Sequence, residues 1–253
     1  MSILEANAIA FSTSLGLIAG YQLYLRYRLR NNPAYTIQAI NAQARATWVE
    51  SIMTSRERDV LAVQTLRNST MAATFLASTA ILLIIGVLNL MQKNDGIGSV
   101  LSLVHQEHSA MSTHIWGFKL LPLLVVFFWA FFCFTLAIRM YNHVGYLINA
   151  SSGKAFGPTP SFVAQLLNRS GHYYSLGMRA YYLSVPLVFW LFGPLFLLVA
   201  SIGLVVVLYH VDRAPDVTVS PQKGSRSVYT ANDPIPLVPR KSTGTDQGLV
   251  ASS

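Results

Sequence analysis

The sequence has 253 residues, of which 53% are hydrophobic and 11% are charged, and its mean hydropathy is +0.44. A soluble domain carries about 25% charged residues, so this composition excludes an ordinary water-soluble domain and favours an integral membrane protein. The net charge of +8 would suggest nucleic acid as the partner of a soluble protein. Here the basic residues flank apolar segments, where anionic lipid headgroups attract them. We therefore expect a lipid bilayer, and no nucleic acid, as partner.

Four stretches have the roughly 20 apolar residues that a helix needs to cross a bilayer. They cover approximately residues 7–25, 70–91, 116–138 and 183–209, and none has an acidic or basic residue in its middle. The single cysteine, Cys133, lies within the third stretch, which excludes an intrachain disulfide or a thiolate metal cluster. The sequence therefore predicts an all-α fold, an integral membrane four-helix bundle within residues 1–213.

The distribution of arginine predicts the orientation of these spans. Glu5 precedes the first span and Arg26, Arg28 and Arg30 follow it, and cytoplasmic segments hold the excess of basic residues. The connection between the third and fourth spans is also basic, whereas residues 92–115 contain one lysine. Four passes would then place both termini on the outer, periplasmic side, for a protein of the bacterial inner (plasma) membrane.

Two segments lie outside the predicted spans. Residues 36–69 have no internal Gly or Pro and carry apolar residues at helical spacing, which predicts a cytoplasmic helix that continues into the second span. Residues 214–253 are rich in Pro, Ser and Thr without apolar periodicity. This composition predicts a disordered C-terminal tail.

Several runs of residues resemble one family of membrane proteins, the domain of unknown function 599 family. The resemblance covers residues 45–209 and implies a multi-span membrane topology without implying an activity. It is carried by Gln64–Asn68, Ala77–Ala80, Lys119–Leu121, Arg139–His143, Gly177–Tyr182 and Trp190–Pro194.

A first candidate site is a histidine-rich group predicted on the outer face. His105 and His108 are three residues apart and share a helix face, and Met111 continues that stripe. Imidazole ligands suit copper or zinc, and a thioether favours copper, although a metal site needs three or four converging ligands. The alternative is a solvated loop with interfacial histidines. The further candidate ligands on this face are Glu107, His114 and His210.

A second candidate site gathers polar residues at the predicted cytoplasmic ends of the second, third and fourth spans. Arginine forks beside amide and phenol groups suit a phosphate or carboxylate, so these residues could bind a lipid headgroup or another anion, or form an inter-helix polar clamp. Simple interfacial anchoring is the alternative. The residues are Arg67, Asn68, Arg139, Tyr141, Asn142, His143 and Arg179.

These patterns favour a non-catalytic membrane protein, an accessory or structural subunit that packs against other membrane protein subunits of a larger complex. No nucleophile–base pair or phosphate-binding loop is visible, so we predict no catalytic residues. The alternative is an outer-face copper- or zinc-binding protein that acts in metal delivery or as an enzyme. A small transporter ranks third, because ion pathways usually contain charged residues inside the spans.

Overall fold

The computed structural model describes residues 3–31, 35–54, 59–92, 113–150 and 157–213. Within these residues the chain is all-α, as predicted, and four of its helices are long and apolar enough to cross a membrane: α1, α3, α5 and α7. The six helices are α1 (Ile3–Asn31), α2 (Ile37–Thr54), α3 (Asp59–Gln92), α5 (Thr113–Ala150), α6 (Pro160–Trp190) and α7 (Pro194–Asp212).

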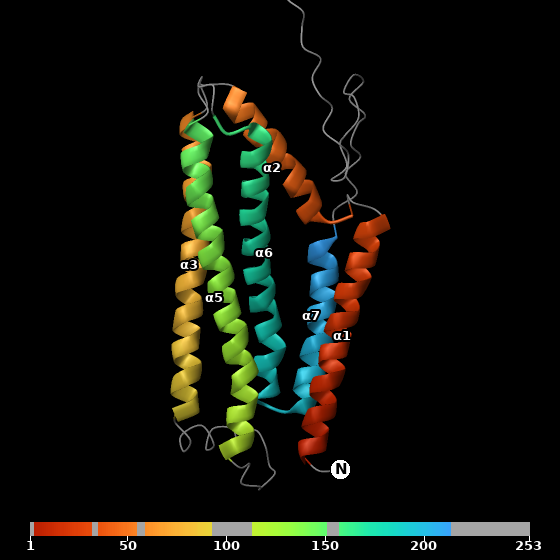
Figure 1. Cartoon of the computed structure of the whole chain (residues 1–253). Helices are drawn as coiled ribbons and strands as arrows, with labels where there is room; N and C mark the ends of the chain where they lie inside the picture. The colour runs from red at the N-terminus through yellow and green to blue at the C-terminus, as the bar shows by residue number, and fades with distance from the viewer. Residues whose placement is uncertain (1–2, 32–34, 55–58, 93–112, 151–156, 214–253) are drawn as a thin grey trace, which may run out of the picture. The chain divides into compact units, whose positions relative to one another are not determined.

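Helices α3, α5 and α6 lie side by side along most of their length (Figure 1). Near one end, Ile84 of α3 packs in a cluster with Leu120 of α5, and further along Ala77 packs with Ala130. Residue numbers therefore fall along α3 as they rise along α5, so these helices are antiparallel. Helix α6 is antiparallel to α5 as well, because Lys119 of α5 meets Trp190 and Phe134 meets Gly177, and it returns the chain along most of α5.

Helices α1 and α7 form a second, parallel pair. Their contacts rise together in residue number, because Ser14 of α1 meets Ser201 of α7 and Tyr21 meets Asp212. The cluster of Tyr21, Leu25, Leu204 and Leu208 fills the space between them. Helix α7 also packs on α6, which connects this pair to the other three helices.

A separate hydrophobic cluster lies where α3 begins and α5 ends. It includes Val49 and Ile52 of α2 and Val144 of α5, all at most 3% exposed. Helix α2 covers α6 there, and an isolated β-bridge joins Thr36, just before α2, to Arg213 at the end of α7. We call this end of the helices the arginine-rich end, after Arg28 and Arg30 in the last turn of α1 and the other arginines nearby.

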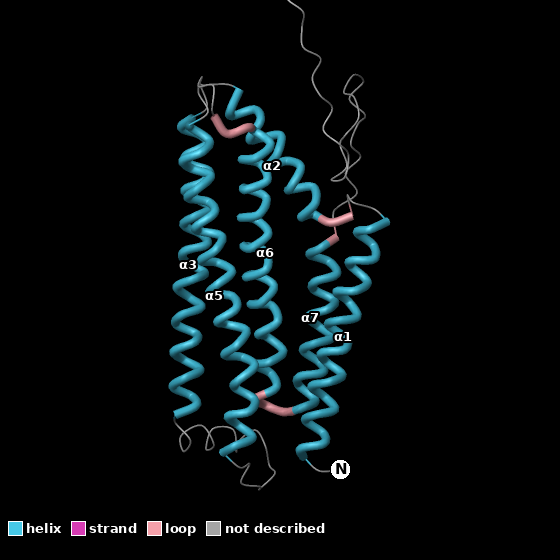
Figure 2. Tube along the Cα trace, viewed as in Figure 1, coloured by secondary structure: helices cyan, strands magenta, loops and turns pink. Residues whose placement is uncertain are grey.

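The predicted fourth span, residues 183–209, is divided in the structure. Helix α6 ends at Trp190 and α7 begins at Pro194, with a short loop between them (Figure 2). Gly193 adopts a φ of 153°, a conformation that residues with a Cβ rarely adopt, and Pro194 occupies the first turn of α7, where its missing N–H leaves no helical bond unmade. Together they end one helix and start the next.

This division changes the number of passes along the bundle from four to five. Helix α6 has 31 residues and lies beside α5, so it counts as a pass even though it is not among the helices apolar enough to span by composition. The amino end of α1 and the carboxyl end of α7 consequently lie at opposite ends of the helices. The predicted placement of both termini on one face does not agree with this arrangement.

The predicted helix over residues 36–69 is also divided. Helix α2 ends at Thr54 and α3 begins at Asp59, while residues 55–58 lie outside the described part of the chain. The predicted disordered tail, residues 214–253, is outside it as well.

Candidate functional site

The described residues include an ion pair buried among α1, α6 and α7. Arg179 of α6 places Nη2 at 3.0 Å from Oδ1 of Asp212, and these side chains are 20% and 7% exposed, respectively. Nη1 of the same arginine donates to Oε1 of Gln22 at 2.9 Å. The hydroxyl of Tyr21 donates to Oδ2 of Asp212 at 3.0 Å. Three helices therefore meet at one charged group.

The depth of this ion pair follows from the spacing along α1. At the opposite end of the helices, Oδ1 of Asn7 accepts from the indole N–H of Trp190 at 3.0 Å. Gln22 lies 15 residues after Asn7, which is about 22 Å at 1.5 Å per residue. The hydrocarbon core of a bilayer is about 30 Å thick. A bilayer whose boundary lay at Asn7 would therefore contain the Arg179–Asp212 pair within its apolar interior.

The opposite end of the helices holds a second buried charge. Lys119 of α5 is 2% exposed, and its Nζ donates to the carbonyl oxygen of Trp190 at 3.3 Å. The same Nζ lies 5.7 Å from the centroid of the Trp190 ring. Because the carboxyl end of a helix carries a partial negative charge, Lys119 stabilises the end of α6. The ring of Phe11 stacks on Trp190 with centroids 4.8 Å apart.

These polar groups hold helices together. The hydroxyls of Ser14 and Ser201 share a buried hydrogen bond between α1 and α7, and the hydroxyl of Tyr181 donates to the carbonyl oxygen of Leu76, between α6 and α3. Among the described residues, every buried side-chain nitrogen and oxygen has a hydrogen-bond partner. The Ser14–Ser201 and Tyr181–Leu76 hydrogen bonds therefore each join two helices.

The seven residues of the predicted anion site or polar clamp do not form one bonded group in the described structure. Arg67, Asn68, Arg139, Asn142 and His143 are exposed, and Tyr141 is buried. Arg179 is bonded to Gln22 and Asp212, and the described residues show no hydrogen bond between it and the other six. The sequence thus singled out Arg179 but assigned it different neighbours. The acidic partner went unnoticed because Asp212 stands 33 positions away.

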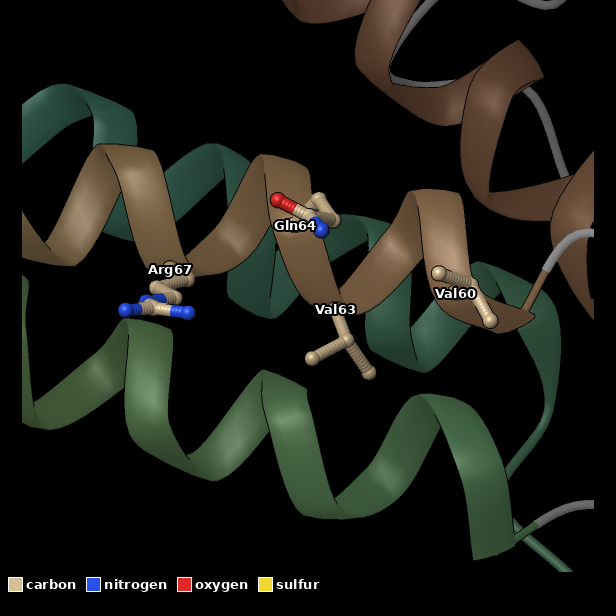
Figure 3. A pocket seen from close by; sticks show the side chains of 4 residues that line it. All are labelled: Val60, Val63, Gln64 and Arg67. Atoms are coloured by element: carbon tan, nitrogen blue, oxygen red, sulfur yellow. The ribbon is translucent and has the colours of Figure 1, made fainter.

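Arg67 instead lines a small open pocket on α3. The other lining residues are Val60, Val63 and Gln64. Val63 and Arg67 point toward α5 in this pocket (Figure 3). Val60 is 73% exposed and Val63 is 49% exposed, so the pocket has an apolar surface with one basic residue at its edge.

The predicted metal site lies mostly outside the described residues. His105, Glu107, His108 and Met111 belong to residues 93–112, and the side chain of His114, in the first turn of α5, is likewise not described. His210 lies in the last turn of α7, where its Nδ1 is 2.9 Å from the carbonyl oxygen of Val206.

The structure does not bring His210 and His114 together. They lie at opposite ends of the helices, because the additional pass of α6 reverses the direction of α7. In the part of the chain that the structure describes, no group of three His, Cys, Asp or Glu residues could hold a metal ion.

Long apolar helices that pack side by side, with buried polar groups paired between them, are typical of a multi-pass membrane protein. A family model described as "Protein of unknown function, DUF599" matches residues 9–217. The chain therefore belongs to this family, which confirms the resemblance seen in the sequence and extends it to α1. No curated protein and no solved structure matches the chain.

Proposed function

We propose that this protein is a non-catalytic accessory or structural subunit of a larger membrane complex. The observation that supports it is the apolar pocket on α3, which lies on a part of this helix that extends past the hydrocarbon core of a bilayer. Helix α3 has 34 residues and is about 51 Å long, whereas the hydrocarbon core is about 30 Å thick. With Gln92 at one boundary, the core ends some 20 residues earlier, so Val60 and Val63 project beyond the apolar interior.

Apolar side chains that lipid does not cover mark a protein–protein contact when they form a patch with a polar rim. Val60, Leu61 and Val63 are 73%, 55% and 49% exposed, and Arg67 supplies a positive charge beside them. The partner surface that fits is apolar with an acidic group opposite Arg67. The paired polar groups inside the bundle support the same proposal, since they keep the helices in a fixed arrangement.

The test is cross-linking from Val63 in the native membrane, with a photoreactive residue at that position. We expect one protein adduct of constant mass, and we expect Val63→Asp to release that protein during purification in mild detergent. Phe75 is the control, because it is 70% exposed on the same helix but lies within the apolar depth, where lipid covers it. A monodisperse monomer with no adduct at Val63 would refute the proposal.

The proposed orientation places the arginine-rich end in the cytoplasm of a bacterial cell, following the excess of basic residues there. The amino end of α1 then faces outward and the carboxyl end of α7 faces inward. Single cysteines at the exposed positions Glu5 and Arg213, in a Cys133→Ala background, test this. A membrane-impermeant maleimide should label the first in intact cells and the second only after lysis. Labelling of both in intact cells would restore the four-pass arrangement.

A small transporter is a second candidate function, and the Arg179–Asp212 pair is the observation that favours it. Ionisable residues inside membrane spans are rare and usually functional. With a bilayer boundary at Asn7, the position of Gln22 along α1 places this pair within the apolar interior. Proton flux into vesicles that contain the purified protein would test this function. A flux that Asp212→Asn abolishes would support it, and vesicles no leakier than protein-free ones would exclude a proton pathway.

A further inference from the structure

Arg45 of α2 is held against α6 in an unusual manner. Its Nε donates to Oδ1 of Asn168 at 2.8 Å. A Cβ added to Gly171 would lie 2.9 Å from Cζ, 3.0 Å from Nη1 and 3.1 Å from Nη2 of this arginine. These nearly equal distances mean that the flat face of the guanidinium lies on the surface of α6 at Gly171. Any side chain at position 171 would press against it.

This arrangement fixes the guanidinium and leaves its two terminal nitrogens available. The face is covered by Gly171 and the Nε edge is bonded to Asn168, so Nη1 and Nη2 present their N–H groups at the remaining edge. Paired N–H groups of this kind match the oxygens of a phosphate or carboxylate.

The charge of Arg45 has no acidic partner among the described residues. No carboxylate in that part of the chain forms an ion pair with it, and the side chain is half-buried. Burial lowers the pKa of Arg45, and only the nearby Tyr141 opposes this effect. A partly desolvated cation is unfavourable unless an anion compensates it. The site therefore suits an anion that the described residues do not supply.

The depth of Arg45 indicates where that anion lies. Asn168 precedes Trp190 by 22 residues along α6, which is about 33 Å. This distance slightly exceeds the thickness of a hydrocarbon core, about 30 Å, so Arg45 lies at the level of lipid phosphates at the arginine-rich end.

We propose that Arg45, fixed by Asn168 and Gly171, binds the phosphate group of a phospholipid at the arginine-rich end of the helices. The site is distinct from the Arg179–Asp212 pair and does not depend on a partner subunit. The same chemistry would accept a soluble phosphate, and the two sources are separated by experiment.

The experiment is native mass spectrometry of the full-length protein in mild detergent, titrated with phosphatidylglycerol or with diacylglycerol, which lacks phosphate. We expect phosphatidylglycerol to bind more tightly, and Arg45→Gln to weaken it roughly tenfold, the ratio that corresponds to about 1.4 kcal/mol for one charge-assisted pair. Arg30→Gln is the matched control, because it removes the same charge from an exposed arginine at the same end. It should change binding less than twofold.

Gly171→Ala provides a variant that keeps every charge. Its Cβ would displace the guanidinium while the flexible arginine accommodates the change, so it should weaken phosphatidylglycerol binding as Arg45→Gln does. It also keeps the proposal testable if Arg45→Gln fails to fold. Equal binding of the two lipids, or equal losses in Arg45→Gln and Arg30→Gln, would overturn the proposal.

Inorganic phosphate identifies the source of the anion. Thermal stabilisation of the protein by inorganic phosphate alone, lost in Arg45→Gln, would assign a soluble phosphate to the site. Retention of phosphatidylglycerol in excess inorganic phosphate would assign the lipid.

Discussion

Replacing Asp212 by Asn removes the negative charge that faces Arg179 and keeps an oxygen in the same place. The two side chains are 20% and 7% exposed and 3.0 Å apart. Leaving one member of a buried ion pair without its partner destabilises a protein by about 3–5 kcal/mol. Arg179 retains its hydrogen bond to Gln22 and some contact with solvent, so we expect the lower value, about 3 kcal/mol.

A double-mutant cycle separates the pair from its surroundings. Arg179→Met alone leaves Asp212 charged, with Tyr21 as its one side-chain donor among the described residues, and a loss of similar size is expected. In the double variant, Arg179→Met with Asp212→Leu, no buried charge remains. The combined loss should therefore be smaller than the sum of the single losses by about 1–3 kcal/mol.

The assay is unfolding in mild detergent by added sodium dodecyl sulfate, followed by circular dichroism. Arg26→Met is the control, since Arg26 is exposed on α1 and such changes usually alter stability by less than about 0.5 kcal/mol. The buried ion pair would be refuted if the two single losses of stability summed to the loss of the double variant within about 0.5 kcal/mol. It would also be refuted if the Asp212→Asn variant were as stable as the Arg26→Met control.

Three further substitutions test the packing of α6 and are measured by the same unfolding assay. Gly177→Ala would place its Cβ 2.7 Å from the buried ring of Phe134, so we expect a loss of about 1–3 kcal/mol; wild-type stability would show that the ring moves freely. Asn7→Leu removes the acceptor for the indole N–H of Trp190 and should destabilise by about 1–3 kcal/mol, with no loss if that N–H finds another acceptor. Gly193→Ala introduces a Cβ at a φ of 153° and should destabilise by about 1–3 kcal/mol, whereas an unchanged midpoint would mean that the loop adopts another conformation.

The candidate site was only partly predictable from the sequence. Arg179 was recognised because arginine close to an apolar span is conspicuous. Asp212 was not recognised as its partner, because four passes place the end of α7 on the outer face, away from Arg179. The partner of a buried charge depends on which helices are adjacent, and adjacency is not a property of composition.

Lys119 shows the same limit. In the sequence it lies near the start of an apolar span, and the structure shows it 2% exposed and bonded to the last carbonyl oxygen of α6. Its burial depends on the contact between the end of α6 and the first turns of α5. The residues next to Lys119 in the sequence do not predict that contact.

The all-α class and the segments able to cross a membrane follow from residue identity alone, because span length and apolar content depend on nothing else. The family is recognisable from the same information. That α6 is a separate pass, in contrast, is visible only in the packed structure. Its 31 residues mix polar and apolar side chains, so averaged hydropathy does not distinguish it from a connection. Only its packing against the neighbouring helices shows that Arg179 and Tyr181 have partners inside the bundle.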